Sequence, residues 1–312
     1  RGRPAMTAGA DDNAYVPLKH SRTVRCRAGE ADYSIRMWGP DTAPPLVLLH
    51  GTRDTSVSFQ FVVDAFKRDW HVIAPDLRGH GLTRSPNRNA WFHEYLADLD
   101  VILETLLPEV AVNLVGHSLG GNLAAVYAAL RPERVCCMIS LDAFGVLASS
   151  EAEYIQSMQA WLRGGVPHYA PQVRYESFEH MAQTLRAINP RLTSAKALYL
   201  ARNISRQLDD GTVTWQFEAR RRRSVPSIRT LQEWTECWRR IRAPSLWVAA
   251  DEPLQTSVRA NPAAFDFVRQ QIGHDRIAYL PDTGHNLHHD APERVAEVVE
   301  EFLLRAIPSA AT

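Results

Sequence analysis

The sequence lacks two features that would narrow its class at once: abundant cysteine and an excess of charge of one sign. Four of its 312 residues are cysteines, and none has the spacing of a zinc site. Cys136 and Cys137 are adjacent within an apolar run, so we expect both to be buried core thiols, which suits a reducing compartment. Basic and acidic residues number 35 each, and the formal net charge is zero. A general nucleic-acid or membrane-surface binder needs a basic excess, so the composition argues against both classes.

Long apolar segments are missing as well. No run is long enough to span a membrane, and nothing near the start resembles a signal peptide. We therefore expect a cytoplasmic protein. We also expect a monomer or homodimer that acts on a small-molecule substrate and has no nucleic-acid or membrane partner. Hydrophobic residues make up 45% of the 312 residues. This length and composition suffice for one large α/β domain that carries an insertion.

Hydrophobic periodicity divides the chain into an arm, a core and an insertion. Residues 1–20 are polar and mixed, and we predict a flexible arm. Residues 21–145 and 241–312 alternate short apolar strands with helices, which is typical of an α/β fold with a mostly parallel sheet flanked by helices. The predicted strands are 23–27, 31–38, 46–49, 70–75, 112–115, 134–141, 244–250 and 276–280, and the predicted helices are 59–66, 91–107, 122–130, 261–272 and 292–305.

The alternation stops in residues 146–240, which we interpret as an inserted, mainly helical cap (lid) over the carboxyl edge of the sheet. Its predicted helices are 151–163, 177–187, 194–207 and 227–239, with one strand at 212–217. Four tryptophans are expected to form the core of the cap: Trp161, Trp215, Trp234 and Trp238. The arginine run at 220–223 is interpreted as a solvated segment, with recognition of an anionic substrate as the alternative.

The clearest local signal is the pentapeptide Gly-His-Ser-Leu-Gly at residues 116–120. It lies between an apolar strand and an alanine-rich helix, which is the context of a nucleophile elbow. In such an elbow a tight turn lifts the serine hydroxyl above the edge of the sheet. We therefore predict that Ser118 is a nucleophile and that the N–H of Leu119, at the start of the helix, points into the same space.

A second tight turn follows the predicted strand at 46–49. Gly51 allows the backbone to turn sharply there, so the N–H of Thr52 is expected to join that of the elbow helix in a two-donor oxyanion hole. At the end of the next strand, Asp76 and Arg78 are interpreted as a structural ion pair that fixes the loop.

Together these features resemble the α/β-hydrolase fold superfamily over residues 21–306, and specifically its serine-hydrolase-like branch with a helical cap. The matching motifs are His-Gly-Thr at 50–52, Asp-Leu-Arg-Gly-His-Gly at 76–81, Gly-His-Ser-Leu-Gly-Gly at 116–121, and Gly-His at 284–285 followed by Pro-Glu-Arg-Val at 292–295. The resemblance implies an eight-stranded sheet, a serine–acid–histidine triad in that chain order, and neither a metal nor an organic cofactor.

His285 is the predicted general base of that triad. It follows a glycine after the last predicted strand and precedes the terminal helix, and a neutral imidazole there would take the proton of Ser118 during attack. His288 and His289 follow closely and are expected to shape the rim of the pocket.

The acid is left among three carboxylates. The family usually places it after the penultimate strand within Gly-x-x-Asp, but this chain has Ala-Ala-Asp-Glu at 249–252 and lacks the glycine. Some relatives, including certain haloalkane dehalogenases, place it after the strand that follows the elbow helix. Asp142 stands there, and a carboxylate ending so apolar a run needs a partner. We favour Asp142, with Glu252 and Asp251 as alternates.

A serine at position 118 separates this chain from relatives such as haloalkane dehalogenases and epoxide hydrolases, whose nucleophile is an aspartate. A serine forms an acyl-enzyme that water can hydrolyse, so the leading hypothesis is a carboxylic ester hydrolase. The alternatives are a C–C bond hydrolase of ring-cleavage diketones and, from another class, a catalytically silent small-ligand receptor. Arg53, His117 and Trp215 are the predicted substrate contacts.

Overall fold

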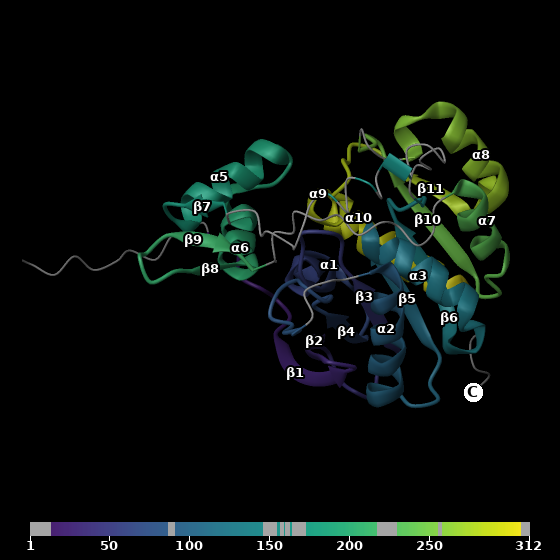
Figure 1. Cartoon of the computed structure of the whole chain (residues 1–312), viewed down its shortest axis with the longest axis horizontal. Helices are drawn as coiled ribbons and strands as arrows, with labels where there is room; N and C mark the ends of the chain where they lie inside the picture. The colour runs from purple at the N-terminus through teal and green to yellow at the C-terminus, as the bar shows by residue number, and fades with distance from the viewer. Residues whose placement is uncertain are drawn as a thin grey trace, which may run out of the picture.

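An eight-stranded sheet forms the centre of the computed structural model, which describes residues 14–86, 91–145, 155–156, 159, 163, 173–216, 230–254 and 258–306. Its strands lie in the order β1-β2-β4-β3-β5-β6-β10-β11 (Figure 1). Their bounds are β1 Ser21–Ala28, β2 Ala31–Trp38, β3 Pro45–Leu49, β4 His71–Pro75, β5 Val112–His117, β6 Val135–Leu141, β10 Ser245–Ala250 and β11 Ile277–Leu280. Every neighbouring pair from β4 to β11 is parallel, whereas the β1–β2 hairpin is antiparallel and joins β4 antiparallel. The predicted mostly parallel, eight-stranded sheet is confirmed.

Helices cover both faces of this sheet, as predicted. The α-helices of this part are α1 Gln60–Ala65, α2 Phe92–Leu106, α3 Leu119–Leu130, α7 Leu231–Arg239, α8 Pro262–Ile272, α9 Leu287–Asp290 and α10 Pro292–Ala306. Among the described residues, four short 3-10 helices accompany them: η1 Ser56–Phe59, η2 Pro132–Arg134, η3 Val258–Ala260 and η4 His274–Arg276. None of the described helices combines the length and the hydropathy that a membrane crossing needs.

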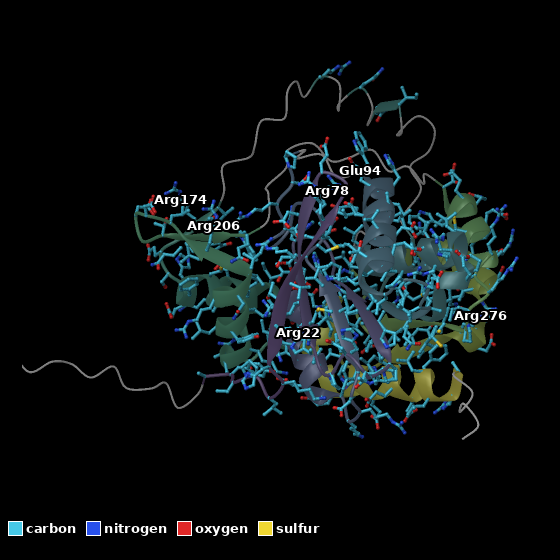
Figure 2. All side chains as sticks on the ribbon, turned by 90° about the horizontal axis from the view of Figure 1, so that it is seen from below. Arg22, Arg78, Glu94, Arg174, Arg206 and Arg276 are labelled. Atoms are coloured by element: carbon cyan, nitrogen blue, oxygen red, sulfur yellow. The ribbon has the colours of Figure 1, made fainter. Side chains whose placement is uncertain are left out.

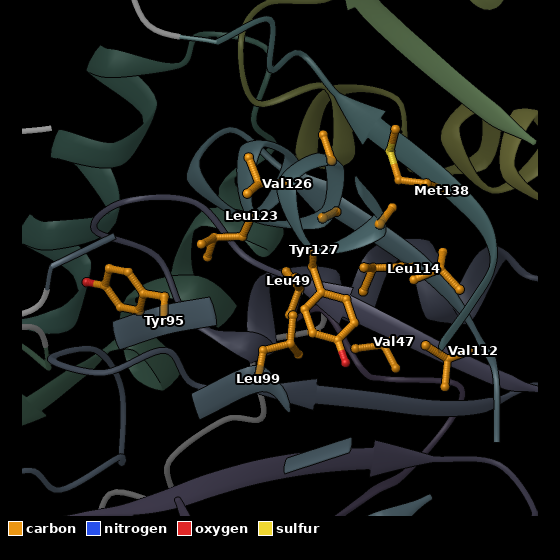
Figure 3. Packing of buried hydrophobic residues seen from close by; sticks show 14 of the residues in the cluster. Val47, Leu49, Tyr95, Leu99, Val112, Leu114, Leu123, Val126, Tyr127 and Met138 are labelled. Carbon is orange, nitrogen blue, oxygen red and sulfur yellow. The ribbon is translucent and has the colours of Figure 1, made fainter. Parts of the chain in front are cut away.

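The core has two halves because successive side chains along a strand point to opposite faces of the sheet. On β3, Val47 and Leu49 belong to one apolar cluster, whereas Leu46 and Leu48 belong to the other. The first cluster includes side chains of α2, α3, α7 and α8, and the second includes side chains of α1 and α10. Figure 3 shows the first cluster, where side chains of α2 and α3 meet those of β3 and β5.

A smaller unit follows β6, at the left in Figure 1. Over residues 173–216 it combines two helices with a three-stranded sheet in the order β7-β9-β8. The elements are β7 Arg174–Tyr175, α5 Phe178–Ile188, α6 Ser194–Ile204, β8 Ser205–Gln207 and β9 Val213–Trp215. Its apolar cluster includes Val57 and Phe61 from η1 and α1, so the unit packs against the segment that follows β3.

The predicted helices at 177–187 and 194–207 are present in this unit, but the second ends earlier than expected. Residues 205–207 pair antiparallel with β9 instead of continuing the helix. Local periodicity does not reveal this pairing because the partner strand comes later in the chain, after a turn at 208–212. Most of the predicted helix at 151–163, and the arginine run at 220–223, lie outside the described residues.

Two of the tryptophans expected in the cap core belong to the main core. Trp234 and Trp238 lie on α7, are each 2% exposed, and join the cluster that also contains Trp247 of β10. The reason is that α7 packs against α3 and α8 rather than against α5 and α6. Trp161 lies outside the described residues.

The prediction that Cys136 is buried is wrong, although Cys137 is buried. Val112 of β5 pairs with Val135 and Asn113 pairs with Cys137, so the register skips Cys136. An extra residue of this kind forms a β-bulge and leaves the regular ladder. Cys136 is therefore exposed at the start of β6.

Asp76 and Arg78 do fix their loop, but they do not pair with each other as predicted. Asp76 accepts backbone N–H groups of Ser56 (2.8 Å) and Leu82 (2.9 Å). Arg78 makes a two-pronged contact with Asp98 of α2, with Nε and Nη2 each 2.8 Å from a carboxylate oxygen. Figure 2 shows Arg78 beside the first turns of α2, where Glu94 is also labelled.

Candidate active site

Ser118 stands at the turn between β5 and α3, in a backbone conformation that serine rarely adopts. Its φ is 52° and its ψ is −114°, which costs about 1–3 kcal/mol and is typical of strained functional turns. The turn is possible because α3 starts directly against β3. A Cβ placed on Gly120 would lie 2.0 Å from the carbonyl oxygen of Leu49. The tight packing of strand and helix therefore holds Ser118, which is half-buried, in this turn at the end of β5.

Three predicted residues from distant parts of the chain meet at this turn. The hydroxyl of Ser118 lies 3.1 Å from Nε2 of His285, and Nδ1 of His285 lies 2.8 Å from Oδ2 of Asp142. A carboxylate only accepts, so Nδ1 carries the proton and Nε2 is free to accept the hydroxyl proton of Ser118. The structure thus brings together the predicted nucleophile, base and favoured acid in one hydrogen-bonded chain.

Asp142 is held in place by two further donors. It follows β6 with a φ of 48°, and its side chain is 1% exposed. Its Oδ1 accepts from Nη1 of Arg259 (2.8 Å) and from the backbone N–H of Ala250 (3.1 Å), which leaves Oδ2 for His285. The side chain of Arg259 is itself buried, and its guanidinium lies over the rings of Phe144 and Phe265. No motif marked Arg259, because 117 positions separate it from its partner.

The two alternate acids lie elsewhere. Glu252 is exposed and forms an ion pair with Arg191 of the smaller unit (2.6 Å). Asp251 is also exposed and accepts the backbone N–H of Asp282 at 3.3 Å. Nδ1 of His285 therefore has Asp142 as its carboxylate partner.

The loop that carries His285 is fixed from both sides. The N–H of Gly284 donates to Oδ2 of Asp290 (2.8 Å), and Oδ1 of Asp290 accepts from Nδ2 of Asn189 at the end of α5 (2.6 Å). Nε2 of His117 lies 2.8 Å from the carbonyl oxygen of His285. The ring of His285 is thus positioned by the smaller unit, by α9 and by the strand that precedes Ser118.

The loop after β3 passes directly in front of Ser118. A Cβ on Gly51 would lie 3.1 Å from the Cβ of Ser118, so the backbone at 51–52 is as close as a glycine permits. Leu119 is the first residue of α3, and its N–H therefore has no acceptor within the helix. These are the two backbone segments expected to provide the oxyanion hole through Thr52 and Leu119.

His117 differs from its prediction as a substrate contact. Its side chain is buried, with 3% of the residue exposed, and its ring lies 4.2 Å from that of His288, centroid to centroid. Burial, together with the neighbouring His288 and His285, holds the pKa of His117 well below its ordinary value. It has little surface to offer a substrate and belongs to a buried cluster instead.

His288 is likewise not part of a pocket rim, because it is completely buried. It packs 4.0 Å from the ring of His289, and burial, with His288 and Lys196 nearby, lowers the pKa of His289 to about 3. Asp54 lies beside them. Burial alone would raise its pKa, but the surrounding histidines outweigh burial and hold that pKa well below its usual range.

The other two predicted substrate contacts, Arg53 and Trp215, belong to different units of the chain. Arg53 follows Thr52 on the loop beside Ser118 and is exposed. Its φ is 61°, and its backbone N–H donates a hydrogen bond to Nε2 of His80 (3.1 Å). Trp215 lies on β9 of the smaller sheet and donates its indole N–H to the hydroxyl of Tyr175 (3.1 Å). Contact of either residue with a substrate stays a prediction.

Comparisons with known proteins agree with this architecture. Residues 46–298 match the model of the alpha/beta hydrolase family. The chain is 24% identical to a serine hydrolase-like protein of Danio rerio over 306 residues, an alignment that covers 93% of each of the two chains. It is 23% identical over 273 residues to monoacylglycerol lipase ABHD6 of Rattus norvegicus, which covers 85% of this chain and 76% of that one. Among solved structures, a thioesterase domain from the curacin biosynthetic pathway has a TM-score of 0.76 at 21% identity, covering 90% of this chain and 99% of that domain.

Proposed function

The chain belongs to the alpha/beta hydrolase family, and we propose that it is a serine hydrolase that cleaves a carboxylic ester or a related acyl compound. The observation that carries the proposal is the hydrogen-bonded chain from Ser118 through His285 to Asp142, with distances of 3.1 and 2.8 Å. The lipase and thioesterase names of the similar proteins concern acyl compounds and support the same substrate class.

The proposed reaction begins with attack of the Ser118 hydroxyl oxygen on the acyl carbon, while Nε2 of His285 accepts the hydroxyl proton. Asp142 keeps the imidazole in the tautomer that can accept this proton and stabilises the resulting imidazolium. The imidazolium then gives the proton to the leaving alcohol or thiol as the bond to the acyl carbon breaks, and an acyl-enzyme on Ser118 remains.

The negative charge that develops on the acyl oxygen needs donors that are already in place. The proposed donors are the N–H groups of Thr52 and Leu119, each contributing about 3 kcal/mol to the stability of the transition state. Water, deprotonated by His285, attacks the acyl carbon in the second half of the reaction, and the serine leaves with the proton from the imidazolium.

The test compares the wild type with Ser118→Ala on p-nitrophenyl esters of increasing acyl length and on a fluorophosphonate probe. We expect the wild type to turn over short or medium esters and to be labelled at Ser118. The alanine variant should lose turnover by about 10⁴-fold or more, since no other group can form the acyl-enzyme. Ser205→Ala, at the end of α6, serves as the matched control and should keep both properties.

Retention of turnover or labelling in Ser118→Ala would contradict the mechanism. A wild type that is folded but neither labelled nor active would favour the silent receptor. Turnover of a ring-cleavage dienoate, with no turnover of esters, would favour the C–C bond hydrolase.

A further inference from the structure

Three side chains that could bind a metal ion lie close together next to the proposed triad, and none of the three has a role in the proposed mechanism. Asp54 comes from the loop after β3, His117 from the end of β5, and His288 from α9. One ligand atom from each of the three lies within 4.8 Å of the other two. His117 and His288 are buried, and the side chain of Asp54 is 14% exposed. We call Asp54, His117 and His288 the Asp-His-His cluster.

His117 is already oriented as a metal ligand. Its Nε2 faces the carbonyl oxygen of His285 at 2.8 Å, and because a carbonyl only accepts, Nε2 carries the proton. The lone pair of Nδ1 is therefore free, and Nδ1 is a buried atom without a hydrogen-bond partner among the described residues. Metal-bound histidines usually donate their second ring N–H to a carbonyl or carboxylate in this way.

His288 also presents a ring nitrogen that the protein leaves unsatisfied. The residue is 0% exposed, and within the described part of the chain neither of its nitrogens makes a hydrogen bond. Burying a polar atom without a partner costs free energy, so such an atom in a folded protein needs an explanation. Its Nε2 lies 3.5 Å from Oδ2 of Asp54.

Asp54 is held toward these nitrogens by short donors. Oδ1 accepts the backbone N–H of Thr55 and Oδ2 accepts the hydroxyl of Ser58, each at 2.8 Å. Both donors are neutral, so they orient the carboxylate without neutralising its charge. The cluster is thus a fixed anion beside two buried imidazole rings. Nδ1 of His117 has a free lone pair, and Nε2 of His288, which faces Oδ2 of Asp54, releases its proton when a metal ion binds.

We propose that the Asp-His-His cluster binds a divalent first-row transition metal ion of the zinc type. Two imidazole nitrogens and one carboxylate oxygen are a ligand set that suits Zn²⁺ and leaves one position for water, whereas Mg²⁺ and Ca²⁺ prefer all-oxygen sites. Bonds of about 2.1 Å in tetrahedral geometry place ligand atoms about 3.4 Å apart. The pair His288 Nε2 and Asp54 Oδ2 already lies at 3.5 Å, and one ring nitrogen of His117 lies within 4.8 Å of the ligand atoms of both residues. The proposal departs from the sequence-based expectation of no metal.

A metal ion at this position joins the three segments that surround Ser118. The Asp54 loop also carries Thr52, His117 precedes Ser118, and His288 lies three residues after His285. Because the ion binds the folded chain, it raises the free energy of unfolding. The increase grows with the logarithm of the ratio of the free ion concentration to the dissociation constant.

The test uses the full chain, freed of metal with a chelator and titrated with Co²⁺. We expect visible d–d absorption that saturates at one Co²⁺ per chain, displacement of these bands by Zn²⁺, and a higher Tm with either metal. Asp54→Asn and His288→Gln should each raise the dissociation constant by more than about 100-fold, because each removes one of only three protein ligands.

Two matched variants separate this site from its neighbours. His289→Gln changes a histidine whose ring packs against His288 but which is outside the cluster, and Ser118→Ala removes the proposed nucleophile. Both should keep the Co²⁺ bands. A wild type without saturable bands and without a Tm shift would overturn the proposal and leave the contact between His288 and Asp54 as a buried ion pair. Bands that persist in both Asp54→Asn and His288→Gln would overturn it as well.

Discussion

At the scale of the residue, the sharpest prediction concerns Asp142, which three donors hold in one orientation. Asp142→Asn keeps the shape of the side chain, and asparagine tolerates the positive φ of this position. It removes the charge that stabilises the His285 imidazolium and presents an amide that favours the wrong tautomer, so kcat should fall by about 10³- to 10⁴-fold. Steady-state hydrolysis of a p-nitrophenyl ester by the purified variant measures this.

Glu252→Gln is the matched control for this carboxylate. Glu252 lies on the surface and pairs with Arg191, so its loss should change kcat by less than about twofold and leave the stability nearly unchanged. If Glu252→Gln lost activity and Asp142→Asn kept it, the acid would have to be assigned to the end of β10.

At the scale of the element, the position of Ser118 depends on how closely α3 approaches β3. In Gly120→Ala the new methyl group would lie 2.0 Å from the carbonyl oxygen of Leu49 and 2.8 Å from that of His50, both of which are backbone atoms. The helix must move away, so we expect the free energy of unfolding to fall by more than about 3 kcal/mol and esterase activity to be lost. Urea unfolding followed by circular dichroism gives the first quantity.

Gly211→Ala is the control that separates the steric clash from the backbone penalty of replacing a glycine that has a positive φ. Gly211 has a φ of 83° but nothing within 4 Å of a Cβ, so only the backbone penalty of about 1–2 kcal/mol applies. Equal stabilities for the two variants would mean that α3 does not pack against β3 as closely as described.

At the scale of the whole molecule, the pH dependence of stability should include a contribution from His71 on β4. Burial lowers the pKa of His71, and although Asp41 opposes this effect with Oδ1 at 3.2 Å from Nε2, the net shift is downward. Below about pH 6.5 the unfolded chain therefore takes up a proton that folded His71 resists, and stability falls as the pH falls. The slope from this residue is at most about 1.4 kcal/mol per pH unit.

Comparison with His71→Gln isolates this contribution from those of the other histidines. Measured by urea unfolding between pH 8 and pH 5, the wild type should lose stability relative to the variant as the pH decreases. Asp41→Asn should steepen the loss, because Asp41 raises the pKa of His71. A difference between wild type and His71→Gln that stays constant with pH would show that the pKa is not lowered.

The sequence by itself determined the sheet, most of its helices and the turn that carries Ser118. These features depend on signals within a few residues of one another: apolar runs for strands buried on both faces, the helical period of the flanking segments, and small residues where strand and helix meet. Parallel strands also share one carboxyl edge, which is why Ser118, Asp142 and His285 were expected to meet there.

Only the tertiary structure decided which carboxylate faces His285 and what else surrounds it. Asp142 and His285 are 143 positions apart, and a choice among three carboxylates at two strand ends depends on side-chain direction rather than on local pattern. Arg259 and the Asp-His-His cluster were not anticipated for the same reason. A partner that comes from a distant segment leaves no periodic trace in the sequence, because its contact exists only after the strands and helices have packed.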